Sequence, residues 1–219
     1  MFWQDEPTEA TYQVPDDVMD LAFSISCEAI PVDHALALAL AIEEILPWFS
    51  TEPEAGLHLI HGGASINGWQ RPETADELLL LPKRAKLRLR LPKHRIDDAA
   101  LLYGKTLEVA GHMIEVGGYK SQLLGKTDTL LSRYIVSDAT EGDEAFTERM
   151  LSELRAMGLE FTKIISGQDH TLVGPDGQLT VKSLLVSGLN IRSSIELQIK
   201  GIGPHRNMGF GLFIASKSI

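Results

Sequence analysis

The stretch KRAKLRLRL at residues 83–91 decides the fold class, because its polar and apolar side chains alternate with a period of two. That period places the cations on one face of a β-strand and the aliphatic side chains on the other. A strand of this kind is typical of an antiparallel sheet with one face on a core and one face in solvent. Pro92 follows and ends the strand. The predicted cationic face consists of Arg84, Lys86, Arg88 and Arg90.

The residues on either side supply the rest of one folding unit. Leu21–Cys27 alternates and predicts a strand, Ala35–Leu46 is rich in helix formers, and Gly56–Ile60 predicts a second strand. After the cationic strand, Ile96–Tyr103 predicts a short helical segment, and Thr106–Val116 predicts one or two strands around a glycine.

A second set of elements follows with the same order. The helix at Asp143–Met157 has an apolar stripe at helical spacing, which indicates packing on a sheet. The other expected elements are strands at Leu130–Ser137, Phe161–Ser166, His170–Val173, Val181–Ser187 and Leu212–Ala215, and a helix at Ser193–Lys200.

The order is β-α-β-β-α-β, twice, which predicts an α+β fold of two tandem ferredoxin-like (RRM-like) units. We expect an acidic N-terminal segment at residues 1–17, one unit at 18–125 and another at 126–219. A glycine-rich loop at 201–211 leads into the last strand.

The composition excludes several classes of protein. The chain has 219 residues, of which 44% are hydrophobic and 23% charged, so disorder, collagen and coiled coil are poor descriptions. The longest apolar run, Ala35–Ile42, is too short to span a bilayer, and no basic segment begins a secretory signal. The single cysteine, Cys27, excludes an internal disulfide and a multi-cysteine zinc site. We therefore expect a cytoplasmic protein with no membrane contact, no cofactor and no metal.

The net charge of −10 hides a strong asymmetry along the chain. Residues 1–70 hold 12 Asp and Glu and no Lys or Arg, whereas Lys83–Arg95 holds seven Lys and Arg and no acid. A local basic stripe on an acidic protein can bind nucleic acid. The alternative is an ordinary solvated face of a sheet.

The segment GIGPHRNMGFG at residues 201–211 carries four glycines with a histidine and an arginine between them. Glycines allow backbone N–H groups to approach a phosphate closely, and Arg206 adds a positive charge. A tight connection between helix and strand would use the same residues. It is not a mononucleotide P-loop, because it lacks the Gly-Lys-Ser/Thr ending and precedes a strand.

This loop, ending in Met-Gly-Phe-Gly-Leu-Phe at 208–213, resembles the signature of the CRISPR repeat-processing endoribonucleases of the RAMP superfamily. The segments IPVDHA at 30–35, LRLRLP at 87–92 and SGL at 187–189 are similar to the MYXAN-subtype branch. The resemblance implies tandem ferredoxin-like domains and metal-independent cleavage of CRISPR repeat RNA. It also implies attack by a ribose 2′-OH, which leaves a 2′,3′-cyclic phosphate and a 5′-OH.

The resemblance also implies a catalytic histidine in the first turn of the first helix, where His34 stands. The residues alone favour a different interpretation, in which His34 only begins the apolar face of that helix, and the resemblance reverses this preference. His205, inside the glycine-rich loop, is a second choice for the base, and Arg206 is the predicted phosphate stabiliser. His58 and His61 lie on a strand with their side chains on opposite faces, so a metal pair is not expected.

The expected partner is CRISPR repeat RNA, together with other CRISPR effector subunits. The predicted RNA-binding residues are Arg84, Lys86, Arg88, Arg90, Gly203, His205, Arg206, Asn207 and Gly209. Two other functions stay open: a non-catalytic crRNA-binding subunit of an effector complex, and a protein-interaction scaffold that uses the acidic N-terminal third.

Overall fold

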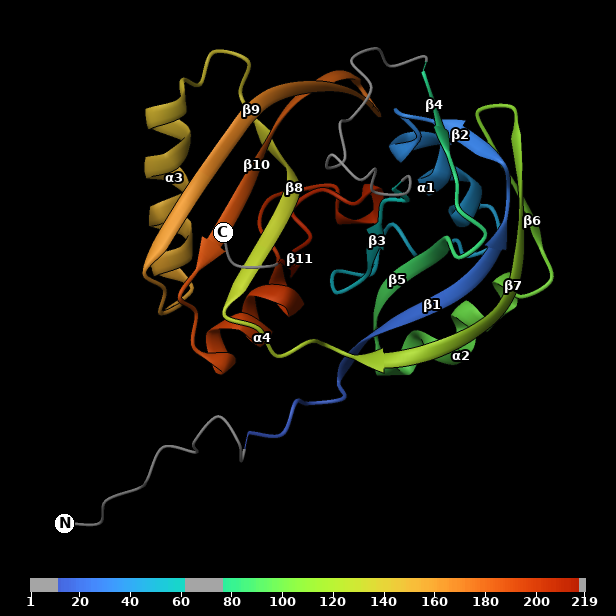
Figure 1. The fold of residues 1–219 in the computed structure, drawn as a ribbon, viewed down its shortest axis with the longest axis horizontal. Coiled ribbons are helices and arrows are strands. Elements are labelled where there is room, and N and C mark those ends of the chain that lie inside the picture. The colour runs from blue at the N-terminus through green and yellow to red at the C-terminus, as the bar shows by residue number, and fades with distance from the viewer. Residues whose placement is uncertain (1–11, 62–76, 217–219) are drawn as a thin grey trace.

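The structure is a computed structural model that describes residues 12–61 and 77–216 (Figure 1). Most of the predicted acidic segment at 1–17 lies outside the described residues, as do the last three residues of the predicted second unit. Two antiparallel sheets stand on either side of the molecule, with segments of both halves of the chain between them (Figure 1). The fold is α+β.

The first sheet has the strand order β3-β5-β1-β7-β6, and every neighbouring pair is antiparallel. Its central strand β1 pairs with β5 on one side and β7 on the other. The strands are β1 (Val18–Ser26), β3 (Gly56–His58), β5 (Lys86–Pro92), β6 (Thr106–Val109) and β7 (His112–Leu123).

The cationic strand begins three residues later than the alternation predicts. A turn precedes it, in which the N–H of Ala85 donates to the carbonyl of Pro82 at 2.8 Å. The alternation of polar and apolar residues therefore extends into a turn that is not part of the strand. A small second sheet pairs β2 (Ala29–Pro31) with β4 (Leu78–Leu80), which the sequence did not predict.

One face of the first sheet packs on short helices. The elements are α1 (Ala35–Glu43), α2 (Ile96–Ala99) and the 3-10 turns η1 (Lys93–Arg95) and η2 (Ala100–Leu102). Leu21, Phe23, Leu87 and Leu89 of the sheet are fully buried in one core with Leu38 of α1. The sheet thus has its aliphatic face inside, as its alternation predicts.

The other large sheet has the order β11-β8-β10-β9. Its elements are β8 (Thr129–Ser137), α3 (Asp143–Ala156), β9 (Lys163–Gly174), β10 (Gly177–Ser187), α4 (Ile191–Lys200) and β11 (Ile214–Ala215). The two strands predicted at 161–166 and 170–173 form the single long strand β9, because polar residues continue the ladder with β10. The prediction of two separate strands was wrong.

The two sheets meet through the glycine-rich loop. A third buried cluster joins Ala35 and Ala39 of α1 to Tyr134 of β8 and to Met208 and Phe210 of the loop. Figure 1 shows this red segment in the centre, between β3 and β8. In the part of the chain that the structure describes, no helix has the length and apolarity that crossing a bilayer requires.

Candidate nucleic-acid interface

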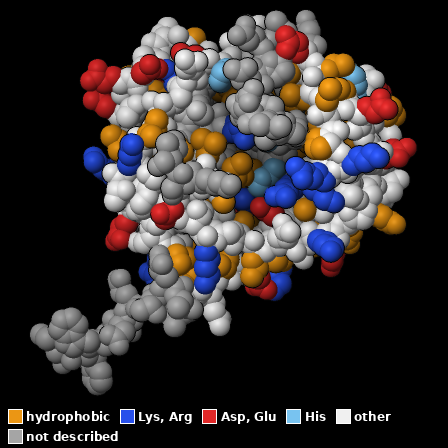
Figure 2. Space-filling model, in the orientation of Figure 1, with side chains coloured by type: hydrophobic (Ala, Val, Ile, Leu, Met, Phe, Trp, Pro, Cys, Tyr) orange, Lys and Arg blue, Asp and Glu red, His pale blue; other side chains and the backbone are white. Residues whose placement is uncertain are grey.

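A cleft of about 540 Å³ opens between the two large sheets. Among the described residues, its lining holds five Lys and Arg side chains and a single carboxylate. Figure 2 shows blue and pale blue side chains gathered around a hollow on the front face. Charges of one sign in a cleft concentrate an oppositely charged ligand there, even on a protein with an acidic total. The charged and titratable lining residues are Asp20, His58, His61, Arg84, Lys86, Arg88, Arg90 and Arg133.

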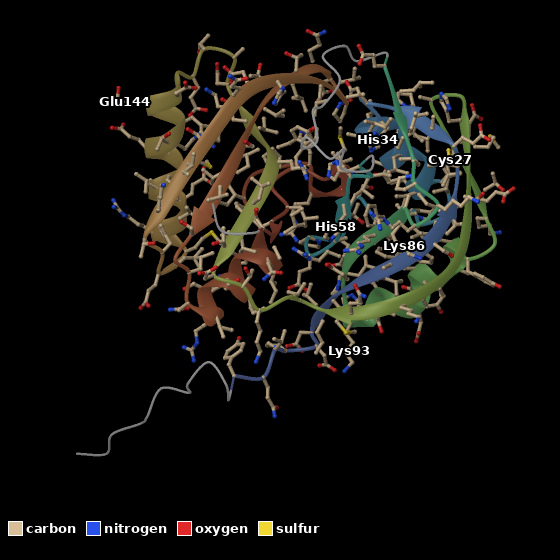
Figure 3. All side chains as sticks on the ribbon, in the orientation of Figure 1. Cys27, His34, His58, Lys86, Lys93 and Glu144 are labelled. Carbon is tan, nitrogen blue, oxygen red and sulfur yellow. The ribbon has the colours of Figure 1, made fainter. Side chains whose placement is uncertain are left out.

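Three of the four cations predicted on one strand face are exposed and line this cleft, although Arg84 lies in the turn before β5. The side chains of Arg84, Lys86 and Arg88 point away from the core. Figure 3 shows Lys86 on β5 and His58 on β3. The register places Ala22 opposite both Arg88 and Lys120, so Lys120 of β7 shares their face of the sheet. Sequence analysis missed Lys120, because only strand pairing brings it beside the cationic strand.

Arg90 is the exception, and its assignment as an RNA-binding residue is corrected. Its side chain is 1% exposed. Nε and Nη2 donate to the two carboxylate oxygens of Asp20 at 2.8 and 3.1 Å, and Nη1 donates to the carbonyls of Gln198 at 2.9 Å and Phe213 at 2.8 Å. The alternation correctly predicted that Arg90 lies on the same face of the sheet as Arg88, but the second half of the chain covers that end of the face.

His58 shares the carboxylate of Asp20 with Arg90. Its Nε2 lies 3.1 Å from Oδ1 of Asp20. Burial lowers the pKa of His58, and the positive charges of Arg90 and Arg88 lower it further, although the bond to Asp20 acts in the opposite direction. Burial by itself would raise the pKa of Asp20, but Arg90 and His58 hold it well below its usual range. His58 is therefore neutral at pH 7, and Asp20 is ionised.

His34 occupies the N-cap position of α1 and is 2% exposed. Its Nδ1 lies 2.8 Å from the carbonyl of Pro31, and its Nε2 lies 3.2 Å from the backbone N–H of Ile60. These partners assign a neutral ring in which Nδ1–H donates and Nε2 accepts. The helix-start interpretation and the catalytic one are both compatible with this placement.

A second, much smaller hollow of about 10 Å³ borders His34. His61 and Tyr134 line both this hollow and the main cleft. The structure therefore brings two side chains close to His34: His61, from the segment after β3, and Tyr134, from β8. The sequence suggested His61 only as part of a metal pair with His58 and gave no support for Tyr134 as the acid, since nothing in the sequence shows that these distant residues lie beside His34.

The glycine-rich loop is packed against the first sheet and α1. A Cβ on Gly209 would lie 2.8 Å from the carbonyl of Leu57, and one on Gly211 would lie 1.7 Å from the carbonyl of Ile202, so both positions require glycine. Nδ2 of Asn207 donates to Oε1 of Glu43 at the end of α1, at 2.8 Å. These contacts fit the predicted tight connection. The N–H groups of Gly201, Ile202, Met208, Gly209, Phe210 and Gly211 already donate to backbone carbonyls, so the candidate phosphate donors of the loop are the amides of Gly203, His205, Arg206 and Asn207.

The other predicted loop residues have distinct environments. His205 has a left-handed backbone, and its ring meets that of Phe210 edge-on with centroids 6.3 Å apart. Gly203 is exposed. Nη1 of Arg206 donates to the carbonyl of Lys200, while Nε and Nη2 are buried and have no hydrogen-bond partner among the described residues.

Arg206 does not stand beside His34. It is absent from the linings of both hollows. Burial and the nearby charge of Arg90 lower the pKa of Arg206 to about 10, so it remains a cation at pH 7. Within the described residues, no group of three His, Cys, Asp or Glu is arranged to hold a metal ion.

Comparison with known proteins gives one consistent family. A family model described as "Cas6 Crispr" matches residues 19–218. A protein from Myxococcus xanthus (strain DK1622), named CRISPR-associated endonuclease Cas6, is 27% identical over 197 residues, which cover 90% of this chain and 80% of that protein.

Solved structures share the fold. One, described as CRISPR associated protein Cas6, has a TM-score of 0.63 at 13% identity and covers 91% of this chain and all of its own. A second, described as an RAMP protein binding different RNA substrates, has a TM-score of 0.58 at 12% identity, with 91% and 100% coverage. A third, from a Cas6-related gene of Pyrococcus furiosus, has a TM-score of 0.57 at 13% identity, with 90% and 97% coverage.

The lowered pKa of His58 predicts that stability falls on mild acidification. Below its ordinary pKa of 6.5, the unfolded chain takes up a proton that folded His58 excludes, so the free energy of unfolding decreases from pH 7 to pH 5. His58→Gln keeps an N–H donor for Asp20 and does not titrate. The variant should lose less stability over this interval, by at most about 1.4 kcal/mol per pH unit. Urea denaturation at pH 7 and pH 5 measures the difference.

The matched control is His94→Gln, since the His94 side chain is 65% exposed. This variant should follow the wild-type pH dependence. Equal pH dependence of the wild type and His58→Gln would show that His58 is not held neutral. Asp20 does not affect the comparison, because its lowered pKa changes the free energy of unfolding only near and below pH 3.8, the ordinary pKa of an aspartate.

Proposed function

Because the chain belongs to the Cas6 family, we propose that it is an endoribonuclease that cuts CRISPR repeat RNA and remains bound to its product. The observation that carries this proposal is the cationic cleft between the sheets, in which Asp20, the one lining carboxylate among the described residues, is already paired with Arg90. In this part of the chain the cleft therefore presents Arg84, Lys86 and Arg88 to a ligand without an unpaired lining carboxylate beside them. Such a surface suits a polyanion.

The relatives support RNA as the polyanion. The Myxococcus protein is named an endonuclease, and one structural relative is described as binding RNA. We place repeat RNA along β5, with Lys120 on the same face of the sheet. Neighbouring strands of a sheet lie about 4.8 Å apart, so Arg88 of β5 and Lys120 of β7 stand roughly 10 Å apart on either side of β1. This spacing accommodates one strand of nucleic acid.

The cut follows from the chemistry of the ribose. A base takes the proton of the 2′-OH, the oxygen attacks the adjacent phosphorus, and the 5′-oxygen leaves with a proton from an acid. The products are a 2′,3′-cyclic phosphate and a 5′-OH, and the reaction requires no metal ion. We assign His34 as the base, since Nε2 of its neutral ring can accept a proton. In this role Nε2 exchanges the N–H of Ile60 for the ribose hydroxyl.

Other groups complete the proposed site. Tyr134 and His61 border the hollow next to His34 and are candidates for the acid that protonates the leaving group. Arg206 keeps two buried guanidinium nitrogens without a partner among the described residues, which supports a role as an anion-stabilising cation. Because Arg206 borders neither hollow, it would reach the RNA phosphate from the loop. The backbone at Gly203, His205 and Asn207 is the proposed RNA-binding part of the loop, and Gly209, whose N–H already donates to the carbonyl of Arg206, would contribute only a close approach of the backbone.

We interpret the two large sheets as tandem ferredoxin-like units at 18–125 and 126–219. In the first sheet β1 lies between β5 and β7, with β3 at one edge and the additional strand β6 at the other, and in the second large sheet β8 lies between β10 and β11, with β9 at the edge. Each set also has its own buried core. We place the protein in the cytoplasm, where its proposed substrate is made, and leave other effector subunits as proposed partners.

A non-catalytic crRNA-binding subunit is the second candidate. The burial of His34, with both ring nitrogens already hydrogen-bonded, favours it. The same cleft would bind the repeat in either case, so binding alone does not separate the two functions.

Incubation with labelled repeat RNA in EDTA tests the proposal. We expect cleavage at one position in each repeat, and no cleavage when that ribose carries a 2′-deoxy substitution, because the attacking oxygen is then absent. Gel analysis of end-labelled products also shows whether the 5′ fragment ends in a cyclic phosphate. A requirement for added metal would refute the mechanism, and tight binding without cleavage would establish the second candidate.

His34→Asn tests the proposed base while keeping the fold. The asparagine Nδ2 can replace Nδ1–H as the donor to Pro31, but the amide cannot accept a proton at neutral pH. We expect single-turnover cleavage to fall by about 10²–10⁴-fold, with repeat binding nearly unchanged. His112→Asn, at a histidine outside both hollows, should cleave as the wild type does. Wild-type rates for His34→Asn would remove His34 from the mechanism.

The cationic face predicts the salt dependence of binding. If each cation neutralises one phosphate of a single strand, its loss reduces the slope of log K against log salt by about 0.7. Arg84→Ala with Arg88→Ala should therefore reduce the slope by about 1.4, and Lys120→Ala by a further 0.7 or so. Filter binding between 50 and 300 mM salt, at roughly these limits, measures it.

The control for these variants is Arg155→Ala, at an exposed arginine of α3 away from the cleft. Its salt slope should equal that of the wild type. An unchanged slope in the double variant would mean that the cationic strand is only a solvated face.

A further inference from the structure

We infer that Arg90 is a positioning residue whose buried guanidinium fixes both ends of the glycine-rich loop to the first sheet. Nη1 donates to the carbonyl of Gln198 at 2.9 Å and to that of Phe213 at 2.8 Å. Gln198 lies just before the loop at 201–211, and Phe213 lies just after it. One nitrogen atom therefore joins the chain that enters the loop to the chain that leaves it.

The other side of the guanidinium is fixed by β1. Nε and Nη2 bind the two carboxylate oxygens of Asp20 at 2.8 and 3.1 Å. A bidentate pair of this kind defines the plane of the guanidinium as well as its position. Asp20 in turn accepts a hydrogen bond from His58 of β3. Through Arg90 and Asp20, hydrogen bonds thus hold both ends of the loop in a fixed position relative to three strands of the first sheet, namely β5, β1 and β3.

One of these strands, β5, carries the exposed cations Lys86 and Arg88. Arg88 and Lys86 project from β5 on the same face as Arg90, towards the cleft. A shift of the loop ends relative to β5 would change the spacing between the loop backbone and these cations. Resting on the proposed function, the consequence is that Arg90 sets the geometry of the bound phosphate without touching it.

The contacts demand arginine rather than a positive charge. Lysine carries one nitrogen, which cannot meet both carboxylate oxygens and both carbonyls from a single position. Arg90→Lys therefore keeps the charge opposite Asp20 and loses the connection between the loop ends. A second variant, Asp20→Asn with Arg90→Met, removes both charges and so avoids leaving a buried carboxylate unpaired.

Hydrogen exchange on the free protein, together with RNA kinetics, tests the inference. The backbone N–H of Ile202 donates to the carbonyl of Gly211, and that of Gly211 donates to the carbonyl of Tyr134. In both variants these two amides should exchange at least about tenfold faster, while the amides of β1 and β8 exchange as in the wild type. Single-turnover cleavage should fall on the order of 10- to 100-fold. Affinity for the 2′-deoxy repeat should change by less than about threefold, because the cations on β5 remain.

Arg149→Lys is the matched control. Arg149 makes the same kind of contacts, a pair with both oxygens of Glu141 and a bond to the carbonyl of Val136, but it projects from α3. Its substitution should change neither the exchange of the loop amides nor the rate of cleavage.

The outcomes separate the inference from the function on which it rests. Unchanged exchange at Ile202 and Gly211 in both Arg90 variants would overturn the inference. Faster exchange with wild-type cleavage would overturn the positioning role. Faster exchange in a protein whose wild type does not cut RNA would support the contact and refute the proposed activity instead.

Discussion

Burying a guanidinium is costly unless its N–H groups have partners, and Arg90 finds them by joining parts of the chain more than a hundred residues apart. Asp20 supplies the countercharge, and two backbone carbonyls at the base of the glycine-rich loop supply the remaining acceptors. The position of the second half of the chain over the first sheet depends on this set of bonds. The same bonds pair Asp20, the one carboxylate among the described residues that line the cleft, so it does not offset the charge of Arg84, Lys86 and Arg88.

This pairing explains how a protein with a net charge of −10 can present a surface suited to RNA. Apart from Asp20, the acids of the described residues lie outside the cleft lining, some of them on the exposed first turn of α3. The cations gather on β5 and the turn before it, and Lys120 lies on the same face of β7, across β1. Over distances longer than about 10 Å salt screens the acids, so the local field in the cleft decides what binds there.

His34 combines a structural role with the proposed chemical one. Its ring joins the start of α1 to the segment that follows β3, through Pro31 and Ile60. The same two bonds define which nitrogen carries the proton, and a base whose tautomer is already set needs no rearrangement of protons before it acts. Tyr134 and His61 border the same hollow because the third buried cluster holds β8 against α1.

Periodicity by itself determined the α+β class, most of the strands and helices, and the cationic face of β5, because alternation and helical spacing are local properties of the chain. The glycine-rich loop could also be recognised from the sequence, because backbone positions with a positive φ favour glycine and therefore appear in the sequence as glycine residues. Local pattern has no information about what covers a face. Arg90 therefore looked identical to Arg88, and only the packing of α4 and β11 over one end of the sheet buried it. The contribution of Lys120 and the grouping of His34, His61 and Tyr134 likewise came from strand pairing and from contacts between the two sheets, which join residues that the sequence keeps far apart.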